Sequence, residues 1–160
     1  QERLLRTMDG LTPAQLNALP VAASAPSIKS IGWLVWHSAR EQDLQIAALA
    51  GTEALWTRDG WNRRFAFDLP DDTEDWRHTP AEAARVIIRD AALLRDYLAA
   101  AIEAVISYLQ HLPPQALDDI IDPNCNPPVT RAVRLVSIID DAAMHSGQAV
   151  YVRRLLGLTD

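Results

Sequence analysis

Apolar side chains recur every three or four residues along three long stretches of this chain, which is the spacing of amphipathic α-helices. The stretches run from Ser27 or Ser30 to about Ala50, from Thr79 to about Leu109, and from Thr130 to near Gly157. A glycine follows the first stretch and another closes the third, and glycine is a common helix terminator. The pattern therefore predicts three long helices.

The remaining segments are shorter and less regular. Residues 1–9 are typical of the last turns of an amphipathic helix, and Thr12-Pro13 is a helix start. We expect a linker over residues 20–26, irregular structure over 51–78 and a proline-rich loop over 111–129. No segment has the pattern of a convincing strand. The sequence predicts an all-α four-helix bundle, formed as a single domain over residues 1–160.

Composition and charge narrow the possible partners. Hydrophobic residues make up 49% of the chain and charged residues 22%, as in ordinary globular proteins. The formal net charge of -6 argues against nucleic-acid binding, which needs a basic surface. No apolar run is long enough to cross a bilayer, and no signal peptide is evident. The single cysteine, Cys125, excludes an intrachain disulfide and favours a cytoplasmic protein.

The strongest chemical signal is Asp141 and His145, which lie four residues apart in the third predicted helix. This spacing places both side chains on one helix face, one turn apart. A carboxylate and a neutral imidazole are good ligands for a divalent metal, although two ligands hold it weakly. His37 in the first predicted helix is the best candidate for a third ligand. Such a set leaves coordination positions open, as in catalytic metal sites.

Several neighbours of these residues are candidates for supporting roles. Glu41 lies one turn after His37 and could accept a hydrogen bond from a ligand or become a fourth ligand. Gln148 could orient a bound water or ligand. Trp33 lies one turn before His37, so the two rings can touch. With the other tryptophans it forms either an aromatic wall over the site or a cap on the core. Arg40 or Arg63 could pair with a substrate carboxylate.

Simpler explanations remain open for the same residues. Histidines on helices are often ordinary core or surface residues, and Asp141 and His145 could form only an ion pair within one helix. The chain contains neither a His-Glu-x-x-His motif nor the Glu-x-x-His pairs of di-iron bundles. We expect Asp75 and His78 to be solvated in an irregular segment, and Cys125 to be an incidental loop thiol.

Three motifs together resemble the DinB/YfiT-like superfamily. Residues 30–43, SIGWLVWHSAREQD, are similar to its second helix, and HSGQ at 145–148 with RRLLG at 153–157 is similar to its last. Residues 56–65, WTRDGWNRRF, resemble a bacterial DinB-like subgroup. The resemblance implies an up-down-down-up bundle, often a homodimer. It also implies a divalent metal (Zn, Ni or Fe) held by His37, Asp141 and His145. Many members have His in place of Asp141, and the mycothiol-dependent maleylpyruvate isomerase branch has Glu.

The resemblance also implies a type of chemistry. Family members of known activity use the metal to activate a small thiol, such as mycothiol or bacillithiol, for transfer or isomerisation. A divalent cation stabilises thiolate over thiol, which produces a nucleophile at neutral pH. The expected function is a metal-dependent thiol S-transferase or isomerase acting on a small molecule. Two alternatives remain: a non-catalytic, metal-binding or stress-associated dimer, and a bundle without metal that binds a small apolar ligand.

Overall fold

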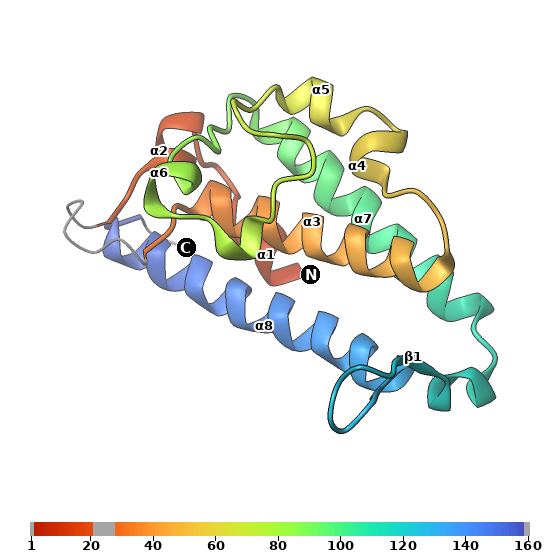
Figure 1. Ribbon diagram of the computed structural model, residues 1–160. Helices are drawn as coiled ribbons and strands as arrows, with labels where there is room; N and C mark the ends of the chain where they lie inside the picture. The colour runs from red at the N-terminus through yellow and green to blue at the C-terminus, as the bar shows by residue number, and fades with distance from the viewer. Residues whose placement is uncertain (1, 21–27, 159–160) are drawn as a thin grey trace.

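Three long α-helices pack side by side in the computed structural model, which describes residues 2–20 and 28–158 (Figure 1). They are α3 (Ile31–Ala50), α7 (Ala91–His111) and α8 (Arg131–Leu155). Helix α3 contacts both of the others, and α8 runs in the opposite direction to α3 and α7 (Figure 1). The predicted helical bundle is confirmed. Ser27 and most of the predicted linker lie outside the described residues.

Short elements connect and flank these helices. The short α-helices are α1 (Glu2–Thr7), α2 (Pro13–Asn17), α4 (Leu55–Arg58), α5 (Trp61–Phe65) and α6 (Pro80–Ala83). Two 3₁₀ turns, η1 (Asp75–Arg77) and η2 (Pro114–Asp118), and an antiparallel hairpin of β1 (Ile120–Asp122) and β2 (Val129–Thr130) complete the chain. The hairpin corrects the expectation of a fold without strands. Within the described ranges, no helix is both long enough and apolar enough to cross a membrane.

The ends of the two site-bearing helices follow from local chemistry. Ser30 begins α3 because its hydroxyl accepts a hydrogen bond from the backbone N–H of Trp33. Gly51 ends α3 in the left-handed conformation, at φ 67°, which costs glycine little. Thr130 begins α8 by accepting from the N–H of Val133. These three boundaries agree with the sequence pattern.

The predicted helix over residues 79–109 is wrong in one respect, because the chain leaves helical structure between α6 and α7. Val86 and Ile88 are buried in the core within this break. Asn17 satisfies the backbone there: its side chain accepts from Ile88 N–H and donates to Ile88 C=O. Asp90 then caps α7 by accepting from Ala92 N–H. The break lets two aliphatic side chains pack where a continuous helix would not place them.

A buried carboxylate attaches α3 to the segment that follows it. Asp43 accepts hydrogen bonds from the backbone N–H groups of Leu55 and Trp56 and from the Tyr97 hydroxyl, at 2.7, 2.8 and 3.0 Å. Burial raises the pKa of Asp43, although these bonds oppose the shift. Trp56 and Tyr97 belong to a core cluster of aromatic rings, together with Trp36, Trp61 and Phe65. This core holds α3 rigidly behind the candidate site.

Candidate metal centre

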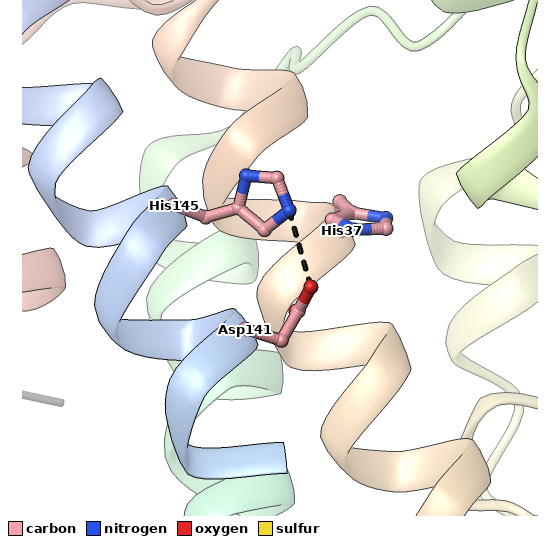
Figure 2. A group of neighbouring side chains, drawn as sticks. All are labelled: His37, Asp141 and His145. Atoms are coloured by element: carbon pink, nitrogen blue, oxygen red, sulfur yellow. Dashed lines mark ion pairs between the residues drawn. The ribbon is translucent and has the colours of Figure 1, made fainter. Parts of the chain in front are cut away.

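His37 from α3 meets Asp141 and His145 from α8 on the surface where the two helices face each other (Figure 2). Each side chain offers a ligand atom within 4.8 Å of the other two. The two imidazole rings lie perpendicular, with their centroids 4.6 Å apart. His37 is buried, whereas Asp141 and His145 are half-buried. The cluster is therefore accessible from one side only.

Asp75 fixes the orientation of His37. Its Oδ2 lies 2.7 Å from His37 Nδ1, and its carboxylate is fully buried. Because an ionised carboxylate only accepts hydrogen bonds, Nδ1 carries the proton and donates it to Asp75. The other ring nitrogen, Nε2, then presents its lone pair. A carboxylate behind a ligating histidine is a common arrangement in metal sites. The expectation that Asp75 is solvated is wrong, because η1 folds back onto α3.

Gln148 does the same for His145. The Gln148 side-chain oxygen lies 2.8 Å from His145 Nδ1, so this ring nitrogen is also committed to an acceptor. His145 Nε2 faces Asp141 Oδ1 at 3.3 Å (Figure 2). Two ligand atoms in a tetrahedral site with bonds of about 2.0–2.1 Å lie at about this separation. The separation of Asp141 and His145 is thus compatible with a shared metal, although aspartate is shorter than glutamate.

The charges of Asp141 and His145 depend on each other. Burial lowers the tendency of His145 to carry a proton, but its hydrogen bonds to Asp141 and Gln148 outweigh burial and raise its pKa. Burial opposes ionisation of Asp141 too, yet the bond to His145 and its charge lower the pKa of this carboxyl. The ion pair that the sequence allows is therefore present. A metal at this position would replace the proton on Nε2.

Glu41 adds a second carboxylate beside the cluster. It offers an oxygen within 4.8 Å of ligand atoms of His37 and Asp75. Its Oε2 accepts from the Gln45 side chain at 3.0 Å, while its Oε1 is covered and has no hydrogen-bond partner among the described residues. Burial and the charge of Asp75 raise the pKa of Glu41. A covered carboxylate oxygen without a partner is costly unless a cation or donor satisfies it, so the residues fit a cation.

One tryptophan of the core cluster, Trp33, also lies against the candidate ligands. Trp33 stacks on His37 with ring centroids 4.6 Å apart, and its ring lies at 78° to the ring of His145, with centroids 6.3 Å apart. Its indole N–H donates to His78 Nδ1 at 3.2 Å, so His78 is part of the same network rather than solvated as expected. Trp36 belongs to the same buried core cluster as Trp33 and packs against Trp56. The wall of the site is thus made by Trp33.

Arg40 does not serve the role that its position suggested. It is buried at 2% exposure and lies over the rings of Trp36 and Trp56. Its guanidinium donates to the carbonyl of Asp71, and its Nε lies 3.6 Å from Asp75. Arg40 therefore holds the η1 segment against α3 and is not available to a substrate carboxylate.

Comparison with known proteins identifies the family of this chain. The profile of the DinB superfamily matches residues 1–149. The chain belongs to the DinB superfamily. A crystal structure of a conserved protein from Enterococcus faecalis is also similar to this DinB protein. The two share 54% identity over 97% of this chain and 89% of that one, with a TM-score of 0.91. No curated protein matches the sequence.

Proposed function

We propose that this DinB-superfamily protein binds one divalent metal ion, Zn, Ni or Fe, through Nε2 of His37, Nε2 of His145 and a carboxylate oxygen of Asp141. The observation that carries the proposal is that ligand atoms of the three side chains lie within 4.8 Å of one another, while Asp75 and Gln148 hold the Nδ1 atoms of the two histidines. Proteins prepare histidine ligands in this way because the outer partner fixes the tautomer and the ring plane.

We infer that the centre activates a small thiol, such as mycothiol or bacillithiol, for S-transfer or isomerisation. Held by His37, Asp141 and His145, a divalent ion would keep open coordination positions and would favour thiolate over thiol. Trp33 excludes water from one side of the site and gives the reacting groups an apolar wall. Glu41, whose pKa is raised by burial and by Asp75, is the group placed to hold a proton nearby. The family membership supports this chemistry.

We also propose that the protein forms a homodimer in the cytoplasm. Its support is the outer face of α8, where large apolar side chains lie exposed at helical spacing: Val133, Val136, Met144 and Tyr151. An exposed apolar stripe of this length is a common feature of interfaces between subunits. The alternative function is a non-catalytic dimer that binds metal without turnover.

Metal analysis of untagged protein tests the ligand set. We expect about one equivalent of metal in the wild type and less than about a tenth in His37→Ala, Asp141→Ala and His145→Ala. His111→Ala is the matched control, because His111 lies exposed at the end of α7 and bonds only within its own helix. If the three ligand variants retain the metal content of the wild type, the proposed ligand set is wrong.

A conjugation screen then separates the two functions. The metal-loaded protein is incubated with mycothiol, bacillithiol and glutathione against a panel of electrophiles, and with maleylpyruvate for isomerisation. Turnover that disappears in His37→Ala and survives in His111→Ala supports the enzyme. A full equivalent of metal without turnover over the whole panel favours the non-catalytic alternative.

A further inference from the structure

A cleft of about 800 Å³ is lined by residues of α3, η1, β1 and α8 and lies beside the candidate metal centre, whose three ligands do not line it. Glu41 belongs to both places, since it lines the cleft and also offers an oxygen close to His37 and Asp75. From there the cleft follows α3 toward its end and α8 toward its beginning, where Arg134 lines it. Arg134 precedes Asp141 by two helical turns, which is about 10 Å along the axis. The cleft thus has an inner end at Glu41, beside the candidate metal centre, and an outer end at Arg134.

The middle of the cleft is apolar. Leu44, Ala48 and Leu49 from α3 form one wall, and Ile121 from β1 contributes to another. Trp76, in the η1 turn directly after Asp75, also lines the cleft and is 55% exposed. An exposed indole beside aliphatic side chains loses unfavourable water contact when an apolar group covers it. The middle of the cleft therefore favours a hydrocarbon or aromatic body.

The outer end carries one available positive charge. Arg131 also lines the cleft, but its guanidinium is committed to Tyr108, Asp119 and backbone carbonyl groups. Asp122 is engaged as well, because its oxygens accept from Asn124 N–H and the Cys125 thiol. Arg134 makes no hydrogen bond or ion pair with any residue in the described ranges, and it is half-buried. Asp122 lies near it, since the pKa of this carboxyl is lowered chiefly by the Asn124 N–H and also by the charge of Arg134. The N–H groups of the Arg134 guanidinium can still donate to an anion in the cleft.

The inner end of the cleft favours a ligand that carries hydrogen-bond donors. Glu41 Oε1 and the side-chain oxygen of Gln45 are both covered, and neither has a donor among the described residues. Unpaired covered acceptors are costly, and a donor on a bound molecule would remove that cost. A second anion there would instead meet the carboxylates of Glu41 and Asp141. The outer end of the cleft thus favours an anion, whereas the inner end favours a hydrogen-bond donor.

We propose that this cleft binds the organic substrate of the centre: an elongated carboxylate with an apolar body. Its carboxylate pairs with Arg134, and an N–H or O–H group at its other end faces Glu41 and Gln45. The description of the bound molecule as substrate rests on the proposed function; its binding in the cleft does not. Arg134 is a specificity-determining residue in this proposal, because it selects the anion about 10 Å from the metal ligands.

Three probes with the same carbon skeleton test the assignment by calorimetric titration. They are 4-(4-aminophenyl)butanoate, its carboxamide, which lacks the charge, and 4-phenylbutanoate, which lacks the donor. We expect 4-(4-aminophenyl)butanoate to bind about five- to tenfold more tightly than either of the other two probes, because each of those loses one polar contact. Arg134→Gln should bring the amino acid and the carboxamide to within about twofold of each other. Gln45→Met should reduce the advantage over 4-phenylbutanoate in the same manner.

Arg63→Gln is the control, since Arg63 is exposed on α5 and does not line the cleft. It should leave all three affinities unchanged, and circular dichroism should show each variant folded. Equal binding of the amino acid and the carboxamide to the wild type would overturn the proposal. An undiminished preference for the carboxylate in Arg134→Gln would overturn it too, as would the absence of binding by every probe.

Titrations of EDTA-treated and zinc-loaded protein separate this inference from the proposed function. Probe selectivity that depends on Arg134 in protein unable to bind metal would retain the cleft and reject the metal centre. One equivalent of metal with three indistinguishable probes would retain the metal centre and reject the cleft as described. The two failures therefore give different results.

Discussion

Asp75 and Gln148 hold the two imidazoles of the candidate centre by the nitrogens that face away from it. These two contacts fix the orientation of both imidazole rings in the metal-free protein. Asp75 also lies 3.6 Å from Arg40. It therefore joins the candidate ligand His37 to the buried arginine that holds η1 against α3. The geometry of His37 is thus set by a segment that is distant in sequence.

Asp75→Asn should therefore weaken metal binding while leaving the ligands intact. The neutral amide still accepts from Nδ1 but makes His37 a poorer ligand, so we expect about a 10- to 100-fold loss of affinity. Competition with a chromogenic chelator measures this loss. Asp72→Asn, at an exposed position of the same loop, should have no effect. Lower stability with unchanged metal affinity would show that Asp75 serves only the fold.

The Asp141–His145 ion pair makes the stability of metal-free protein depend on pH. The folded-state pKa of His145 is raised, so its contribution is full below the ordinary histidine pKa and is lost as pH rises through the raised value. The pKa of Asp141 is lowered, so its contribution is present above the ordinary aspartate pKa and is lost as pH falls through the lowered value. The pair therefore stabilises the fold mainly between roughly pH 4 and pH 7.

Asp141→Asn should accordingly lower the Tm of EDTA-treated protein near pH 5.5 and change it little near pH 9. For a half-buried pair worth about 1 kcal/mol we expect a decrease of about 2–4 °C at the lower pH. Thermal unfolding followed by circular dichroism at both values gives the comparison. An equal decrease at both would mean that the substitution acts through packing and not through charge.

The sequence suggested the meeting of His37, Asp141 and His145, because helix periodicity places polar residues on definite faces. It could not reveal Asp75. A carboxylate in a segment without periodicity gives no sign of the direction in which the chain folds. Gln148 lies three residues after His145, a spacing that predicts a place at the site, and its side-chain oxygen contacts the His145 ring.

At the scale of elements, α3 comes unusually close to the segment between α6 and α7 at Gly32. A Cβ placed on Gly32 would lie 2.6 Å from Ile88 Cγ1 and 3.0 Å from the carbonyl oxygen of Leu16. The absence of a side chain lets α3 pack directly on α2 and on the break before α7.

Gly32→Ala should destabilise the protein by about 1–3 kcal/mol, because the added methyl group overpacks this contact. Gly147→Ala on α8 is the matched control, since its Cβ would meet nothing within 4 Å. Removing a glycine from a helix interior there should stabilise by about 0.5–1 kcal/mol. Urea unfolding of both variants gives the two values. Stabilisation of both would contradict the close approach.

Periodicity predicted the long helices well, and it failed where tertiary contacts override it. Val86-Ile87-Ile88 continues an apolar pattern, so the sequence favoured one helix over 79–109. The run of β-branched residues before Asp90, a good N-cap, is the signal that favours a break. The hairpin β1–β2 is too short for alternation to be recognised, since its strands have three and two residues.

At the scale of the whole molecule, the exposed apolar stripe on α8 bears on assembly. Val136 is 64% exposed and Tyr151 is 63% exposed on this outer face. If the stripe is the homodimer interface, Val136→Glu should convert the dimer to a monomer, because it would bury a charge without a partner. Light scattering after size exclusion measures the mass. Leu109→Glu, at an exposed position on α7, should leave the dimer intact. A wild-type monomer would exclude the interface.

The position of the three ligands along the chain has a consequence for the unfolded state. His37 and Asp141 are 104 residues apart (141 − 37), so a metal held by both would close a loop of most of the chain. For a covalent cross-link, closing a loop of about 100 residues removes enough chain entropy to stabilise the fold by about 4 to 5 kcal/mol. With Cys125 as its only cysteine, the chain cannot make such a link through a disulfide. A bound metal ion would then stabilise the fold as a cross-link, in addition to serving as a reactive centre.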